Sequence, residues 1–277
     1  MIKPCKGAYF CAVEQELGPL AYLAFFTGGI LAGIINTLAG NGSAITLSLL
    51  IFFGLPAGWA NATNRVGVLL QTFTAVLSLR RTESRNRSFK DARFLIIPSL
   101  LGSALGAYLA LRTGDAGLQY FIGGVMVLLL ATMYIKPHRW KIATELNRDR
   151  RTPIMATMFF VIGLYAGYIQ MGIGIMMLAV LVLYAKYSLP DANLIKLLLA
   201  LIYILPAFLV FWLDGKIHWP SGIALAFGQS LGAWYAARHL LQNPKAGEWI
   251  RRLLIVVLVY AILRIFGFFD FIASYLL

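Results

Sequence analysis

The sequence predicts an all-α polytopic membrane protein made of two inverted-topology repeats. Of its 277 residues, 60% are hydrophobic and 13% are charged, whereas soluble domains carry about 25% charged residues. The apolar residues form a series of runs, most of them close to the roughly 20 residues that an α-helix needs to cross a bilayer. The two halves of the chain also share a pattern at a constant offset, which indicates a duplication.

Each apolar run is expected to form a helix. Two of the runs, 43–55 and 174–185, are too short to span a bilayer, and each follows another run after a Gly-containing break. We therefore expect two hairpins that enter the membrane, break and return to the same side. Irregular backbone survives in a bilayer only where it is buried in protein or lines a wet cavity. The longer runs lie at 20–38, 60–79, 94–111, 116–135, 154–171, 192–213, 219–237 and 253–277.

The positive charges indicate topology rather than nucleic-acid binding. The net charge is +13, and Lys and Arg gather between apolar runs, in the segments 80–93, 136–152 and 238–252. Loops rich in Lys and Arg stay in the cytoplasm. We therefore expect a multi-pass protein of the cell (inner) membrane with both termini outside. The lipid bilayer is its expected partner, and no binding to nucleic acid is expected. Whether the protein forms a homo-oligomer stays open.

The duplication predicts how the chain is organised. An offset of 134 places "GILAGIINTLAG" (29–40) on "GLYAGYIQMGIG" (163–174) and Leu55-Pro56 on Leu189-Pro190, and a slightly different offset places "GSALGAYLALR" (102–112) on "GQSLGAWYAAR" (228–238). The loop after residue 80 is assigned to the cytoplasm and its counterpart near 214 to the outside, so the repeats are inverted. Secondary transporters often have this arrangement, with a site near the membrane midplane where the repeats meet.

These assignments divide the chain into four parts. Each repeat is expected to contain one broken, re-entrant hairpin and three transmembrane helices. The parts are an N-terminal tail (1–18), a first repeat (19–135), a cytoplasmic basic linker (136–152) and a second repeat (153–277).

The segments "GIINTLAGNGSAI" and "GLPAGWANATNR" resemble the sulfite exporter TauE/SafE family. The resemblance covers essentially the whole chain, and it implies a polytopic membrane transporter for sulfur oxyanions or organosulfonates. The turn departs from the family pattern at Asn41, which adds an amide where small residues are usual. This departure concerns the identity of the substrate rather than the fold.

Two amides at equivalent positions precede the two breaks. Asn36 and Gln170 are related by the offset of 134. They are expected either to donate hydrogen bonds to an oxyanion or to cap the ends of broken helices, where backbone groups lack partners. The sequence leaves both interpretations open.

The breaks themselves predict an anion site. A helix N-terminus presents free N–H groups and partial positive charge, and glycine allows an anion to approach the backbone. In the second half, Gly172 and Gly174 precede a helix expected to start near Ile175. The alternative is that the glycines only allow close packing in lipid. The candidate residues of the first break are Gly40, Asn41, Gly42 and Ser43.

Two cations lie inside apolar runs, where a charge is costly and therefore a candidate for function. Arg65 follows Thr63 and Asn64, and its planar guanidinium matches an oxyanion. Lys196 occupies a comparable place in the second half. Alternatively, either side chain snorkels to the surface, or Lys196 pairs with Asp191. Arg264, in the last run, receives no role.

Taken together with the resemblance, which implies a sulfur-containing substrate, these residues predict export or exchange of sulfite or an organosulfonate by alternating access. An anion channel using the same site is the alternative, and a membrane-embedded enzyme of sulfur metabolism is a weaker one. We expect no catalysis and no cofactor, because no phosphate-binding loop, metal-ligand cluster or nucleophile–base pair is visible. Whether Cys5 and Cys11 form a disulfide stays open.

Overall fold

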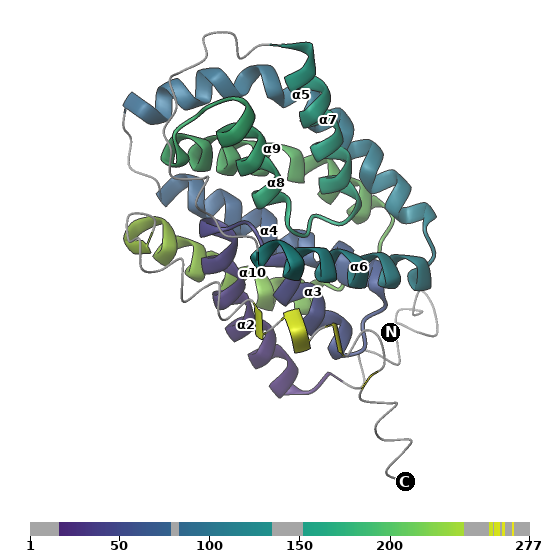
Figure 1. The fold of residues 1–277 in the computed structure, drawn as a ribbon. Helices are drawn as coiled ribbons and strands as arrows, with labels where there is room; N and C mark the ends of the chain where they lie inside the picture. The colour runs from purple at the N-terminus through teal and green to yellow at the C-terminus, as the bar shows by residue number, and fades with distance from the viewer. Residues whose placement is uncertain are drawn as a thin grey trace.

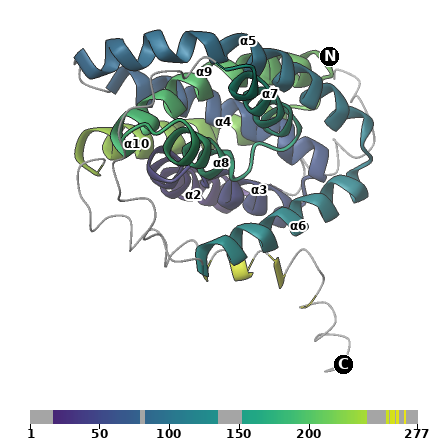
Figure 2. The ribbon, with the colours of Figure 1, turned by 45° about the horizontal axis from the view of Figure 1, so that its top comes forward.

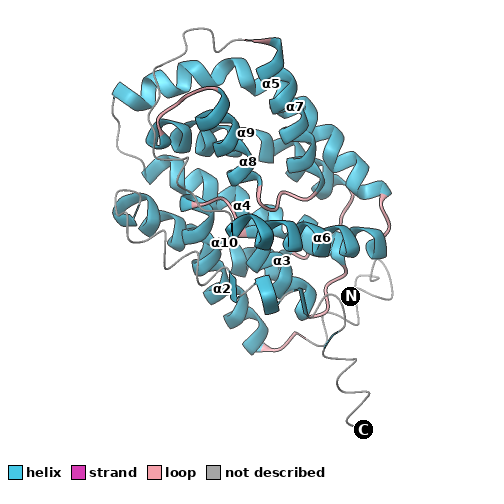
Figure 3. Cartoon of the chain, in the orientation of Figure 1, coloured by secondary structure: helices cyan, strands magenta, loops and turns pink. Residues whose placement is uncertain are grey.

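The computed structural model describes residues 17–78, 83–134 and 152–240, with a few positions between 255 and 268. Every regular element in these ranges is a helix (Figure 3), which confirms the predicted all-α class. Three of the described helices are long and apolar enough to cross a membrane: Pro19–Leu38, Arg93–Arg112 and Leu189–Leu213. Outside the described residues lie most of the N-terminal tail with both cysteines, the linker up to residue 151, and Arg264.

The first half breaks at its glycines, as the sequence predicts. Helix α2 (Pro19–Leu38) ends just before Gly40, whose φ of 77° is strained for any residue with a Cβ. The chain restarts in α3 (Ser43–Phe52), a helix of 10 residues that is too short to span. The longer helices that follow are α4 (Ala57–Ser78), α5 (Glu83–Arg112) and α6 (Asp115–Tyr134).

The second half breaks at the equivalent place. Helix α7 (Pro153–Tyr168) is followed by a turn in which Gln170 and Gly172 have φ of 63° and 75°. The short helix α8 (Ile173–Ala179) begins earlier than predicted, so Gly174 lies in its first turn and not before it. The chain continues as the π-helix η2 (Val180–Tyr184), α9 (Leu189–Leu213), α10 (Trp219–Tyr235) and the π-helix η3 (Ala236–Leu240).

The two halves interlock rather than forming separate lobes. Helix α10, from the second half, packs along α2 of the first half, and α5, from the first half, packs along α7 of the second (Figure 1). Helix α4 lies in the middle of the bundle in both views, against α9 and α10 (Figure 2). Each half therefore completes the packing of the other.

The two helix crossings use equivalent residues. Gly33 of α2 lies against the backbone of Gln229, and Gly167 of α7 lies against the backbone of Ser103. The offset of 134 relates the two glycines, and the alignment of 102–112 with 228–238 relates the two partners. Small residues at such crossings let helix backbones approach closely in a membrane. The sequence repeat thus reappears as a repeated set of contacts.

A first prediction concerns this close packing. Gly33→Ala is expected to lower the free energy of unfolding by about 1–3 kcal/mol, because a Cβ at Gly33 would overlap the backbone of Gln229. The control is Gly124→Ala in α6, where a Cβ would meet no atom within 4 Å; there we expect no loss and a gain of up to about 1 kcal/mol from helix propensity. SDS titration in mixed micelles measures both. Equal losses for the two variants would contradict this account of the crossing.

The outer surface fits a lipid environment. Large apolar side chains point outward, among them Leu213 at 85% exposure and Leu20 at 75%. Aromatic groups mark both ends of α10: the rings of Trp212 and Trp219 lie 6.5 Å apart at one end, and Arg238 lies 5.2 Å from the ring centroid of Trp234 at the other. A helix of that length places the two groups about 22 Å apart. Aromatic side chains favour the two membrane–water interfaces in this way.

Candidate functional site

The two broken hairpins touch each other in the centre of the bundle. A Cβ added to Gly40 would overlap Cα of Gly174, and a Cβ added to Gly174 would overlap Cα of Gly40. The two residues are related by the offset of 134. Because only glycine lacks a Cβ, no other residue allows the first break and the first turn of α8 to come this close.

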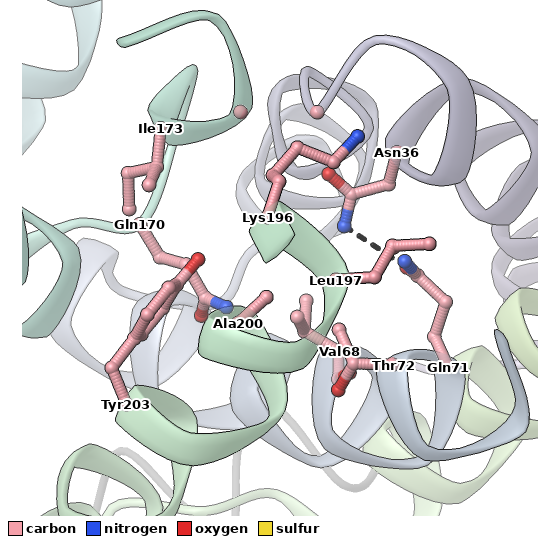
Figure 4. Close-up of a pocket in the computed structure, with 12 residues that line it drawn as sticks. Asn36, Val68, Gln71, Thr72, Gln170, Ile173, Lys196, Leu197, Ala200 and Tyr203 are labelled. Carbon is pink, nitrogen blue, oxygen red and sulfur yellow. Dashed lines mark hydrogen bonds between the residues drawn. The ribbon is translucent and has the colours of Figure 1, made fainter. Parts of the chain in front are cut away.

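A small cavity lies beside this contact and is lined from both halves (Figure 4). Its volume is about 20 Å³, which is enough to hold a water molecule. Five of the predicted site residues line it, contributed by both breaks and by α9. The lining residues are Asn36, Gly40, Val68, Gln71, Thr72, Gln170, Ile173, Gly174, Lys196, Leu197, Ala200 and Tyr203.

Three amides bring unused hydrogen-bonding capacity to the cavity. Asn36 Nδ2 donates to Gln71 Oε1 at 3.1 Å. Gln71 Nε2 and Gln170 Oε1 have no hydrogen-bond partner among the described residues, although these side chains are only 1% and 4% exposed. Buried polar atoms are nearly always hydrogen-bonded, so each exception asks for an explanation. A polar ligand in the cavity would supply the missing partners.

Lys196 is the one basic residue that lines the cavity. Its Nζ donates to the carbonyl oxygen of Thr37 at 3.0 Å, and the side chain is 3% exposed. Thr37 belongs to the last turn of α2, where carbonyl groups carry partial negative charge. That bond uses one of the three N–H donors, and Nζ makes no other hydrogen bond within the described residues. None of the cavity-lining residues is acidic.

Arg65 is fully buried, but its guanidinium points to a helix end and not to the cavity. Nη1 donates to the Ala166 carbonyl and Nη2 to the Gly167 carbonyl, each at 2.7 Å. Asn61 adds a bond from Nδ2 to the Tyr168 carbonyl at 2.7 Å. The two side chains therefore satisfy the last three carbonyls of α7, and a cation there also suits the helix dipole. With 0% exposure, Arg65 does not snorkel to the surface.

The two membrane cations thus occupy related structural positions. Arg65 of α4 caps the broken helix of the second half, whereas Lys196 of α9 caps the broken helix of the first half. The two differ in how fully they are engaged. The Arg65 guanidinium also lies over the ring of Phe211, with Cζ 5.2 Å from the ring centroid. Lys196 has a single partner and lines the cavity, so it is the cation whose remaining donors are available to a ligand there.

The other predicted residues surround the breaks without lining the cavity. Thr63 Oγ1 accepts from the His218 backbone N–H at 3.0 Å, and Asn64 Oδ1 accepts from Thr46 Oγ1 at 2.6 Å. Both bonds hold α4 against its neighbours. Direct contact with a substrate stays a prediction for Asn41, Gly42, Ser43, Thr63, Asn64 and Gly172.

Three polar residues that line the cavity are not among the site residues predicted from the sequence. Gln71 carried a signal, since an amide inside an apolar run is costly unless it has a partner. Thr72 and Tyr203 carried little signal. The hydroxyl of Thr72 donates to the Val68 carbonyl of its own helix at 2.8 Å, as threonines in many helices do. Tyr203 is one of many tyrosines in apolar runs, and only packing places it at the cavity.

The chain resembles curated membrane proteins along nearly its whole length. It is 27% identical over 248 residues to the probable membrane transporter protein ORF9 of Sinorhizobium sp, covering 89% of this chain and 92% of that one. A probable membrane transporter protein of Haemophilus influenzae is 25% identical over 233 residues, covering 83% and 89%. The probable membrane transporter protein YfcA of Escherichia coli K12 is 25% identical over 244 residues, covering 87% and 88%.

These names agree with the prediction of a transporter rather than an enzyme. No solved structure matches the chain significantly. The family profile described as "Sulfite exporter TauE/SafE" matches residues 25–265, which include both breaks and both capping cations. The chain therefore belongs to the sulfite exporter TauE/SafE family of membrane transporters.

Proposed function

We propose that the protein exports or exchanges a small sulfur-containing anion, sulfite or an organosulfonate, by alternating access between two inverted repeats. One observation carries the choice of an anion: Lys196 is buried beside a polar cavity that no acidic residue lines. A buried charge without a counter-charge is strongly disfavoured. A bound anion would supply the counter-charge, and membership of the family supports a sulfur-containing one.

The cavity residues suit an oxyanion. Its oxygens would accept from Lys196 Nζ and from Gln71 Nε2, two cavity-lining groups with unused donor capacity. Asn36 would turn from Gln71 toward the ligand or hold Gln71 in place. Gly40 and Gly174 also line the cavity, and their lack of a Cβ lets the two breaks meet beside the ligand. In this proposal, Arg65 holds the end of α7 and does not touch the anion.

The contact between the two breaks supports a carrier over a channel. The cavity holds about 20 Å³, so an anion of several atoms enters only when the walls separate. We infer that the halves rock about the contact between Gly40 and Gly174 and open the cavity to one side at a time. A channel would need both sides open together. An inside-negative potential favours exit of an anion by about 2.3 kcal/mol per charge per 100 mV, which supports export without a coupling ion.

The test is transport by the purified protein in liposomes. We expect saturable flux of sulfite and methanesulfonate, with counterflow when the same anion is present on both sides. Large unitary currents would favour the channel, and rates equal to those of protein-free liposomes would contradict the proposal.

One variant tests the site within this assay. Asn36→Leu is expected to lower the flux about 10-fold or more, because a hydrogen bond to a charged group contributes about 1.5–3 kcal/mol. The matched control is Thr27→Val on the same helix, since the Thr27 hydroxyl is exposed and bonds only within α2. Unchanged flux in Asn36→Leu would remove this residue from the site.

A further inference from the structure

We propose that the site accepts anions of a single negative charge and rejects dianions, so that sulfite crosses the membrane as hydrogen sulfite. This inference rests on the proposed function and adds the ionic form of the substrate to it. It follows from a count of the charges and hydrogen-bond acceptors that face the cavity.

One positive charge faces the cavity. Of the lining residues, Lys196 and Tyr203 can ionise, and both come from α9. The lining residues from α2, α4, α8 and the two breaks are amides, a threonine, glycines and aliphatic side chains. The second cation, Arg65, is bound to the Ala166 and Gly167 carbonyls and does not line the cavity. A monoanion would therefore be neutralised, whereas a dianion would leave one uncompensated charge in a buried site.

The hydrogen-bond acceptors at the cavity support the same inference. Gln170 Oε1 is buried and unpartnered among the described residues, so it calls for a donor. The O–H of hydrogen sulfite can donate to it, and the fully deprotonated dianion cannot. The Thr37 carbonyl, which accepts from Lys196, adds the partial negative charge of a helix C-terminus near the ligand. Extra negative charge on the ligand would meet these oxygens with repulsion.

The experiment compares three anions in liposomes that contain the full chain. Sulfite changes between one and two negative charges near neutral pH, methanesulfonate keeps one, and sulfate keeps two. We expect sulfite flux to rise on acidification in proportion to the hydrogen sulfite present, methanesulfonate flux to stay constant, and sulfate flux to be at least 10-fold lower. With the potential set by potassium and valinomycin, one charge should move per sulfur atom.

Several outcomes would overturn the inference. The first is a sulfate flux equal to that of methanesulfonate. The second is the movement of two charges for each sulfur atom transported. The third is a sulfite flux that does not change with pH. A pH effect that methanesulfonate shares would also overturn it, because it would report Lys196 or Tyr203 instead of the substrate. If none of the three anions crosses faster than through protein-free liposomes, the proposed function itself fails, so the two failures are distinguishable.

A gain of function gives an independent test. Gln71→Lys would put a second cation beside the cavity, and we expect it to raise the ratio of sulfate to methanesulfonate flux at least 10-fold. Gln71→Leu is the matched control, since it removes the same amide without adding charge and should slow both anions equally. An unchanged ratio in a folded Gln71→Lys protein would contradict the charge count, and the wild-type measurements decide the matter if that variant does not fold.

Discussion

Lys196→Met is expected to reduce sulfite flux in proteoliposomes about 30-fold or more. Methionine has a similar length and no charge, so the variant removes the counter-charge that the proposed anion needs. Removing one partner of a buried, hydrogen-bonded charge pair costs about 2–5 kcal/mol, and about 1.4 kcal/mol corresponds to a factor of ten. The Thr37 carbonyl loses its partner as well, which lowers the free energy of unfolding by about 1–3 kcal/mol. Flux is therefore normalised to folded protein.

The matched control removes a lysine charge elsewhere. Lys216→Met lies in the turn between α9 and α10, where Lys216 pairs with Asp214 at 3.2 Å and both side chains are about one third exposed. Such surface pairs contribute little, so flux and stability should stay near those of the wild type. If Lys196→Met carries sulfite at the rate of Lys216→Met, the assignment of Lys196 as the anion's counter-charge is wrong.

Arg65→Ala is expected to lower the free energy of unfolding by about 2–6 kcal/mol. The change leaves the buried carbonyls of Ala166 and Gly167 without the donors they have now, and each such loss costs about 1–3 kcal/mol. It also empties the space of one of the largest fully buried side chains. SDS titration from mixed micelles measures the loss, and the yield of folded protein after extraction should fall with it.

Two further variants separate a structural role from substrate contact. Arg112→Ala removes an exposed arginine whose Nη2 donates to the Tyr108 hydroxyl at 2.8 Å, and it should change stability by about 0.5 kcal/mol at most. Arg65→Lys keeps the charge but loses the two-pronged geometry, so an intermediate loss of stability is expected. In the folded fraction of Arg65→Lys, the KM for sulfite should equal that of the wild type. A raised KM with unchanged stability would make Arg65 a substrate-binding residue.

The helices and their breaks could be read from the sequence because the signals for them are local. The length of an apolar run limits the length of a helix in lipid, and glycine permits the positive φ found at Gly40 and Gly172. The start of α8 was placed two residues late, since nothing local separates Ile173 from Ile175. The offset of 134 also paired Asn36 with Gln170, and the fold brings both to one cavity.

The partners of the two cations could not be read in this way. Arg65 and Lys196 look alike in the sequence, because each is a single charged residue in an apolar run. Placing either charge in the membrane costs a similar free energy. Arg65 meets carbonyls about a hundred positions further along the chain, and Lys196 meets one on α2, far back toward the N-terminus. Those distances are bridged by the interlocked packing of the halves, which no local pattern encodes.

The amino-acid sequence by itself determined that this is a helical membrane protein with two glycine-broken helices at a constant offset and two costly charges. The length of an apolar run, the position of a glycine and the position of a charge are local features, so the sequence alone shows them. Only the tertiary structure decided which cation binds two carbonyls at the end of a helix and which one lines a cavity. Burial and hydrogen bonding depend on the neighbours that packing brings from the other half of the chain. They bind Nη1 and Nη2 of Arg65 to the end of α7 and leave Lys196 at the cavity with a single hydrogen-bond partner.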